Sequence, residues 1–200
     1  MRKTPFEPGR FYHVFNRGNE KKNIFFEREN YLFFLRRLKA GVEKWGVSVL
    51  VYCLMPNHFH LLLQEALAGG ITNLMLTMQT SYAKAINKRY QRVGHLFQGT
   101  FKNILVDRNE YLIHLSRYIH INPVLAGLAH LPEDWEFSSY RNYVGLRNGK
   151  LPQKEIILSQ FKGSQDYREF VGDFKQAENI KDYVFDDEES NKSSRRLAFK

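Results

Sequence analysis

The chain has 200 residues, of which 43% are hydrophobic and 14% aromatic, so it can bury a core of its own as a folded domain. Its single cysteine, Cys53, excludes a disulfide framework within the chain and a cysteine-based zinc site. The apolar runs are too short to cross a bilayer, and residues 1–10 lack an apolar signal core, so we expect a cytoplasmic protein without membrane contact.

The net charge of +9 is unevenly distributed along the chain. Residues 1–150 hold 21 Lys and Arg against 11 Asp and Glu, a balance of +10, whereas residues 151–200 hold 9 against 10, a balance of −1. A basic field of this kind favours a polyanionic partner, most simply nucleic acid. A soluble surface of high isoelectric point explains the same numbers, and charge alone does not separate the two interpretations.

Strand and helix patterns alternate along the first part of the chain. In residues 27–45, for example, Leu32, Leu35 and Leu38 recur at helical spacing. The predicted elements, in chain order, are a strand at 9–18, a helix at 27–45, strands at 46–55 and 58–64 joined by a Pro-Asn turn, a helix at 71–92, a strand at 97–107 and a helix at 108–122 that stops at Pro123.

This β-α-β-β-α-β order, followed by one more helix, predicts an α+β fold. It is typical of the ferredoxin-like, split βαβ arrangement, in which helices pack on one face of an antiparallel sheet. We expect this domain to occupy residues 1–130. Residues 131–200 are expected to form a C-terminal helical extension, with a polar tail that is mobile from about residue 185.

Two histidines, His58 and His60, stand one residue apart in the apolar strand that follows the turn. Because side chains alternate faces along a strand, both imidazoles point the same way, about 6.5 to 7 Å apart along the backbone. Two imidazoles on one face of a sheet can bind one metal ion. Alternate histidines are an unspecific motif by themselves, and two core histidines placed by chance are the alternative.

Two other histidine-based sites are not supported. A nucleotidyl hydrolase with alternating histidines needs a third histidine on the same face, but that position holds Leu62. A zinc protease needs two histidines at helical spacing with a glutamate, which the sequence lacks.

The last predicted helix carries a second polar pair. Tyr118 and Asn122 are four residues apart and therefore share a helix face. The Asn122 side chain offers a neutral carbonyl oxygen, a suitable ligand for a hard cation, at the expected end of the helix. A core tyrosine followed by a helix-ending asparagine is the alternative interpretation. We interpret His114 and His120, on other faces of this helix, as structural.

Four segments in register resemble a known family: MPNHFHLLLQ (55–64), FQGTFKNILVDRNEYL (97–112), SRYIHINPVLAGL (116–128) and EFSSYRNYVG (136–145). In this order they are similar to the single-tyrosine HUH transposases. Within that family they resemble the REP-associated tyrosine transposases, which are related to the IS200-like transposases. The resemblance runs from about residue 8 to about residue 145.

This resemblance implies that the 1–130 domain cleaves and rejoins single-stranded DNA near REP-like hairpins through a covalent 5′-phosphotyrosine. It implies a divalent metal ion, Mg²⁺ or Mn²⁺, as cofactor. On the family pattern Tyr118 is the nucleophile, and His58 and His60 are metal ligands. Asn122 stands where IS200-like relatives carry a glutamine as third ligand, and its side chain is one methylene shorter. A homodimer fits the family, in which the tyrosine helix serves either its own or the partner's metal.

Basic and polar side chains near these motifs are the predicted DNA contacts. Lys84, Lys88 and Arg92 fall at i, i+4 and i+8 on one face of the 71–92 helix, which suits phosphates, although a solvated helix face has the same pattern. Further candidates are Asn16, Arg17, Lys102 and Arg117.

Three functions therefore stay open at the level of the sequence. The first is a DNA-cleaving transposase, and the second is a domesticated protein that binds hairpin DNA without cutting it. The third is a structural or RNA-binding ferredoxin-like domain with the histidines in its core. Only the first requires Tyr118 to share a pocket with His58 and His60.

Overall fold

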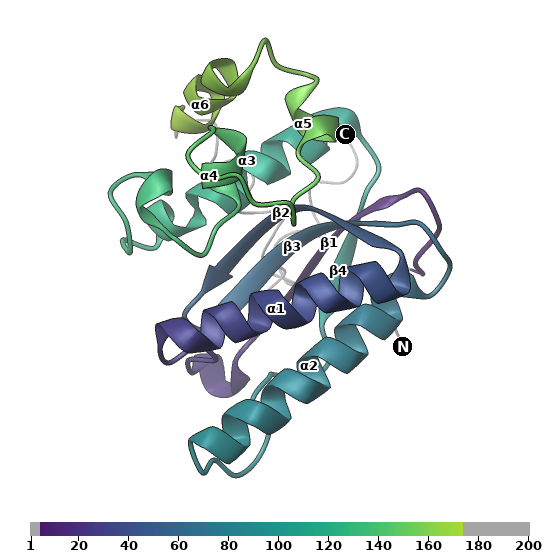
Figure 1. Ribbon diagram of the computed structural model, residues 1–200, viewed down its shortest axis with the longest axis vertical. Helices are drawn as coiled ribbons and strands as arrows, with labels where there is room; N and C mark the ends of the chain where they lie inside the picture. The colour runs from purple at the N-terminus through teal and green to yellow at the C-terminus, as the bar shows by residue number, and fades with distance from the viewer. Residues whose placement is uncertain (1–4, 174–200) are drawn as a thin grey trace, which may run out of the picture.

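The structure, a computed structural model, describes residues 5–173. A four-stranded antiparallel sheet with strand order β2-β3-β1-β4 forms its centre (Figure 1). The strands are β1 (Phe11–Arg17), β2 (Val47–Met55), β3 (His58–Glu65) and β4 (Lys102–Val106), and the long helices are α1 (Arg28–Trp45), α2 (Gly70–Arg89) and α3 (Asn109–Leu125). This βαββαβ order, with β1 beside β3, confirms the α+β, ferredoxin-like fold.

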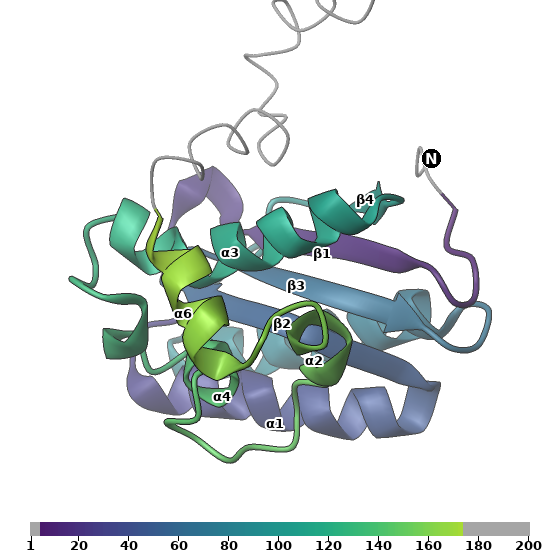
Figure 2. The same ribbon diagram turned by 90° about the horizontal axis from the view of Figure 1, so that it is seen from above.

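Helices cover both faces of the sheet (Figure 2). The crossover helices α1 and α2 pack on one face, as expected for a ferredoxin-like core, and bury a cluster that includes Phe34, Phe59 and Leu74. Helix α3 and the C-terminal helices lie on the opposite face, where a second cluster includes Leu62 and Leu115. The sheet is therefore buried on both sides, and any polar group under α3 is removed from water.

Local sequence signals explain where α1 begins and ends. The Asn30 side chain accepts hydrogen bonds from two backbone N–H groups that precede the helix and would otherwise lack partners. At the other end Gly46 adopts the left-handed conformation with φ of +60°, which costs a residue without Cβ little. The helix therefore stops directly before β2.

The β2–β3 hairpin fixes which way the histidines point. A two-residue Pro-Asn turn pairs Met55 with His58 and sets the register of the whole hairpin. Nearer the beginning of β2, the register shifts between Val49 and Val51. As a result, the α3 side of β2 is lined by a continuous apolar surface beside the histidines.

Strand β4 and helix α2 are among the elements that are shorter than the sequence predicts. Strand β4 begins only at Lys102, because the preceding segment turns at Gly99, which has φ of +77°. Helix α2 ends at Arg89, and Gln91, with φ of +49°, turns the chain before Arg92. The predicted stripe of three basic residues along one continuous helix is therefore interrupted.

Helix α3 is longer than predicted, because it continues through Pro123 to Leu125. The proline removes only one N–H group from the last turn, and the Ala126 N–H still bonds to the Asn122 carbonyl. Asn122 thus lies within the helix rather than at its end.

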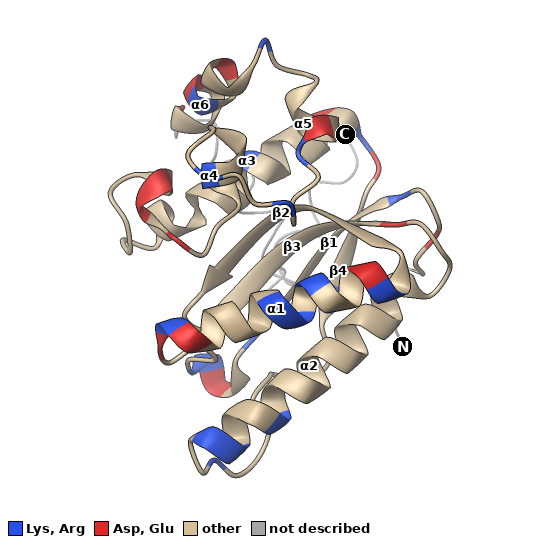
Figure 3. Cartoon of the chain, viewed as in Figure 1, with Lys and Arg blue, Asp and Glu red and all other residues tan. Residues whose placement is uncertain are grey.

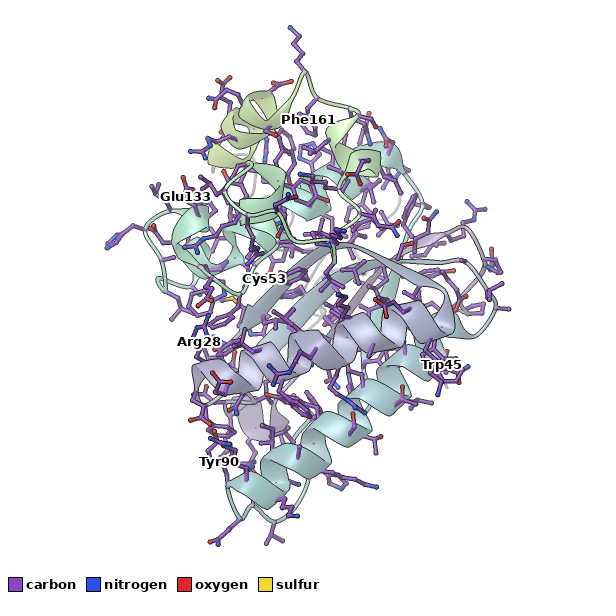
Figure 4. All side chains as sticks on the ribbon, in the orientation of Figure 1. Arg28, Trp45, Cys53, Tyr90, Glu133 and Phe161 are labelled. Atoms are coloured by element: carbon purple, nitrogen blue, oxygen red, sulfur yellow. The ribbon has the colours of Figure 1, made fainter. Side chains whose placement is uncertain are left out.

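Short elements complete the described part of the chain: η1 (Asn19–Lys21), η2 (Pro132–Asp134), α4 (Tyr140–Tyr143), α5 (Glu155–Leu158) and α6 (Ser164–Gly172). The C-terminal segment joins the sheet at Cys53, which pairs with Ser138 (Figure 4). Helices α4 to α6 share the second hydrophobic cluster with α3 and β2. The domain boundary near residue 130 stays a prediction, and the tail from about residue 185 lies outside the described residues.

A buried chain of hydrogen bonds ties α6 to α3. His120 Nδ1 lies 2.8 Å from the Tyr167 hydroxyl, and His120 Nε2 lies 2.8 Å from Ser139 Oγ. The Tyr167 hydroxyl donates to Ser116 Oγ over 3.0 Å. His120 is therefore a structural residue, in line with the sequence interpretation. Within residues 5–173 no helix is both long and apolar enough to cross a membrane.

We predict that Tyr167→Phe lowers the free energy of unfolding by about 1 to 3 kcal/mol, because the buried His120 and Ser116 groups lose a hydrogen-bond partner. Urea unfolding followed by circular dichroism measures this change. Gln165→Ala on the exposed side of α6 is the control and should change stability by less than about 0.5 kcal/mol. Equal stabilities of the wild type and Tyr167→Phe would show that the network contributes nothing.

Candidate active site

The two histidines of β3 lie on the face of the sheet that α3 covers. The strand ladder places Arg17 opposite His58 and Phe15 opposite His60, and paired residues of neighbouring strands share a face. Phe59, between the histidines, points to the α1–α2 side and belongs to the other core. The predicted orientation of both imidazoles is thus the one that the fold adopts.

Helix α3 brings Tyr118 and Asn122 to the same histidines. The Asn122 Oδ1 atom lies 3.3 Å from His58 Nε2, and the ring centroids of Tyr118 and His60 are 5.7 Å apart in an edge-to-face arrangement. A side-chain hydrogen bond also joins Tyr118 to Asn122. All four side chains belong to one chain, so the tyrosine reaches its own histidines in this structure.

Burial sets the electrostatics of the cluster. Loss of solvent lowers the pKa of His58 to about 4, and it lowers the pKa of His60 well below its ordinary value. The same loss of solvent raises the pKa of the Tyr118 phenol, against the effect of its hydrogen bond to Asn122. At neutral pH the imidazoles are therefore neutral, as metal ligation requires, and the phenol is protonated.

The hydrogen bonds of His58 test whether a cation fits. Its Nδ1 lies 2.6 Å from Asn57 Oδ1, while its Nε2 faces Asn122 Oδ1. A neutral imidazole carries one proton, so it can donate to only one of these oxygens. With that proton in the shorter contact to Asn57, Nε2 and Oδ1 face each other as two acceptors. Two ligands of one ion with bonds of about 2.1 Å lie roughly 3 to 3.4 Å apart, in agreement with the observed 3.3 Å.

The donor set is nevertheless short of charged ligands. Among residues 5–173, no three His, Cys, Asp or Glu side chains are arranged to hold a metal ion. A metal here would depend on two imidazoles and the amide oxygen of Asn122. This neutral, mixed N/O set leaves open positions for phosphate oxygens and is compatible with Mn²⁺ or Mg²⁺.

One residue of the cluster is not evident from the sequence. His13 on β1 lies completely buried beside His60, with 2.9 Å between His13 Nε2 and His60 Nδ1. The alternation of β1 already puts His13 on the face of Phe15. The missing information is the register of β1 against β3, since this register makes the two histidines neighbours.

Two predicted DNA contacts share the face of the site. Arg17 lies opposite His58 at the end of β1, and its side chain also donates to Gln98. Lys102 is exposed and pairs with Phe15 on the next strand, which places it about 10 Å from His60 by strand spacing. Two cations thus lie on the same face of the sheet as the histidine cluster.

Lys84 and Lys88 are exposed on α2, on the other side of the sheet. Residues 66–106 contain no Asp or Glu, and Figure 3 shows only basic charge on α2. A cavity of about 460 Å³ beside Lys84 is lined by α2 and the loop before β4, including Phe97 and Phe101. This region therefore forms a second basic surface, distinct from the histidine face.

Three predicted contacts are buried or contact other side chains in the structure. Asn16 is buried, and its Nδ2 donates to Gln79 and to the Gly99 carbonyl, so it holds the end of β1 against α2. Arg92 lies beyond the end of α2, with its guanidinium 5.6 Å from the Phe26 ring centroid.

Arg117 is the third of these residues and is only 2% exposed. Its guanidinium lies 3.6 Å from the centroid of the Phe170 ring on α6. Burial lowers the pKa of this arginine. Arg117 therefore holds α6 against α3, and its position next to Tyr118 in the sequence does not bring it to the site.

A ferredoxin-like sheet with paired histidines under a helix that carries a tyrosine is the arrangement that the resemblance to transposases implies, and comparison with known proteins supports the class. The sequence profile of the family described as Transposase IS200 like matches residues 10–122, more than half of the chain. The chain therefore belongs to the IS200-like transposases, a family of enzymes that cut and transfer DNA strands. The resemblance inferred from the sequence motifs is confirmed.

Two relatives illustrate the similarity. A Haemophilus influenzae protein assigned as a REP-associated tyrosine transposase is 25% identical over 145 residues, covering 68% of this chain and 78% of the relative. The structure of a REP-associated tyrosine transposase bound to a REP hairpin superposes with a TM-score of 0.61 at 15% identity. It covers 76% of this chain and 96% of that chain, which shows a shared fold.

We predict that the metal-free protein loses stability as the pH falls from about 7 to 5. Burial lowers the pKa values of His13 and His120 to about 3 and of His58 to about 4. These histidines therefore bind a proton near pH 6.5 in the unfolded chain but stay neutral in the folded chain. At pH 5 this difference lowers the free energy of unfolding by about 2 kcal/mol per histidine.

Urea unfolding in the presence of a chelator at pH 7.5 and pH 5.0 measures this loss. His120→Gln should reduce the difference in the free energy of unfolding between the two pH values. His130→Ala, at an exposed position, should leave this difference unchanged. Identical unfolding curves of the wild type at both pH values would contradict the prediction.

Proposed function

We propose that this protein is a metal-dependent transposase that cleaves and rejoins single-stranded DNA beside hairpins, with Tyr118 as covalent nucleophile. His58, His60 and Asn122 hold the divalent ion, Mg²⁺ or Mn²⁺. The observation that carries this proposal is the convergence of Tyr118 and Asn122 on both histidines within one chain. The hairpin partner is suggested by the similarity to REP-associated transposases.

The proposed step conserves the energy of the phosphodiester bond. The Tyr118 oxygen attacks phosphorus and forms a new O–P bond, while the bond from phosphorus to the 3′-oxygen breaks. The 5′-phosphate stays on Tyr118, and the phenol proton ends on the released 3′-hydroxyl, which can later reverse the step without ATP. A bound divalent ion supplies Lewis-acid stabilisation of the negative charge on the phosphate.

The burial of Tyr118 adds a requirement to this step. Only 1% of its surface is exposed, so the tyrosine or α3 has to shift before a phosphate reaches the hydroxyl. Arg17 and Lys102, on the same face, are the proposed contacts for the phosphates next to the cleaved bond. Lys84 and Lys88 are proposed to contact a more distant part of the DNA.

We predict that wild type incubated with Mn²⁺ and a labelled single-stranded hairpin DNA forms an adduct that survives denaturing electrophoresis, and that Tyr118→Phe forms none. Tyr90→Phe is the matched control, since Tyr90 lies at the end of α2 on the other side of the sheet (Figure 4). Its adduct should equal that of the wild type. Chelation of the metal should abolish the wild-type adduct.

An adduct of undiminished yield in Tyr118→Phe would overturn the nucleophile assignment. Tight hairpin binding by wild type without any adduct, in Mn²⁺ or Mg²⁺, would favour the alternative of a hairpin-binding protein that does not cut DNA.

We predict that Lys84→Ala combined with Lys88→Ala weakens DNA binding and reduces its salt dependence. For single strands, removing one lysine–phosphate pair should reduce the magnitude of the slope of log K against log salt by about 0.7. Fluorescence anisotropy across a salt series measures both the affinity and the slope. Lys39→Ala on the exposed surface of α1 is the control, and an unchanged slope in the double variant would exclude α2 from the DNA interface.

A further inference from the structure

His13 and His60 form a pair of completely buried histidines in contact with each other. Both are 0% exposed, their rings stack with centroids 5.1 Å apart, and His13 Nε2 lies 2.9 Å from His60 Nδ1. A polar ring in the core is unfavourable unless it is hydrogen-bonded, and an aliphatic residue would fill the same space at no such cost. The His13 position therefore calls for an explanation beyond packing.

The contact between the two rings requires one proton to lie between the two nitrogens. Each neutral imidazole carries a single N–H group, so two arrangements are possible. In the first, His60 Nδ1 donates to His13 Nε2, and His60 Nε2 keeps its lone pair. In the second, His13 Nε2 donates, and the proton of His60 sits on Nε2. Only the first arrangement leaves His60 able to bind a cation through Nε2.

The neighbouring histidine has the same feature. His58 Nδ1 lies 2.6 Å from the Asn57 Oδ1 acceptor, which leaves His58 Nε2 for the side facing Asn122. Each of the two candidate ligands thus has its Nδ1 engaged by a residue outside the ligand set. Such partners fix the tautomer and the ring orientation of metal-binding histidines in general.

We propose that His13 is a positioning residue that accepts the Nδ1–H of His60 and so presents His60 Nε2 to the divalent ion. This inference rests on the proposed function, because it presupposes that His60 is a ligand. His13 itself does not bind the ion. Its Nδ1, which no group among residues 5–173 contacts by a hydrogen bond, carries the second proton of the pair.

Metal affinity tests the proposal without any catalytic assay. Mn²⁺ is titrated into the full-length, DNA-free protein and followed by the electron paramagnetic resonance signal of free Mn²⁺. His13→Phe keeps an aromatic ring but removes the acceptor, and it should weaken Mn²⁺ binding about 10- to 100-fold. His13→Gln offers a carbonyl oxygen to His60 Nδ1 and should recover most of the affinity. Phe11→Leu alters the packing on the same face of β1, at a position that pairs with Gln64 and lies away from His60, and should bind as the wild type does.

Nitrogen-15 spectra of the histidine rings provide a readout that a purely structural role would not move. In the Zn²⁺- or Mg²⁺-loaded wild type, His60 should be protonated at Nδ1, and in His13→Phe a mixture of both tautomers is expected. Thermal unfolding of each variant shows whether it is folded at the titration temperature.

The outcomes separate this inference from the proposed function. Wild-type affinity in His13→Phe, or a metal-loaded His60 protonated at Nε2, overturns the role of His13 and leaves the metal site intact. Absence of Mn²⁺ binding by the wild type overturns the metal site and the role of His13 together, whereas the adduct assay with Tyr118→Phe tests the nucleophile separately.

Discussion

The packing of α3 across the histidine face of the sheet is the interaction on which the site depends. It brings Tyr118 and Asn122 to His58 and His60, and it buries Tyr118, Asn122 and His60 and partly buries His58. One physical cause thus has two opposite effects on ionisation. It lowers the pKa of the imidazoles and raises that of the phenol, so at neutral pH the imidazoles are neutral and the phenol is protonated.

Much of this arrangement follows from short-range periodicity. The two-residue period of a strand puts His58 and His60 on one face, and the helical period puts Tyr118 beside Asn122. Neither period predicts that the histidine pair of the strand and the Tyr118–Asn122 pair of the helix lie close together in space. Only the resemblance of the motifs to a family implies it, because the closeness of the two pairs in space depends on contacts between residues about 60 positions apart.

The surroundings of Arg117, Arg92 and His13 depend on tertiary structure that the sequence pattern does not contain. Arg117 would reach the site only if neighbours in sequence shared a face, but on a helix they do not, and its ring partner Phe170 is far along the chain. The prediction for Arg92 depends on a helix that ends earlier, at Arg89. His13 has no signal in the sequence, because its proximity to His60 depends on the register in which β1 pairs with β3.

Two faces of α3 make different contacts, and these contacts are coupled because both belong to one helix. One face carries Tyr118 into the site, and the other buries His120 in the bonds that anchor Tyr167 and Ser139. If α3 moves as a rigid helix to expose Tyr118, as the proposed function allows, the same movement would strain those hydrogen bonds. The hydrogen bonds between α3 and the C-terminal segment would then resist the opening of the proposed site.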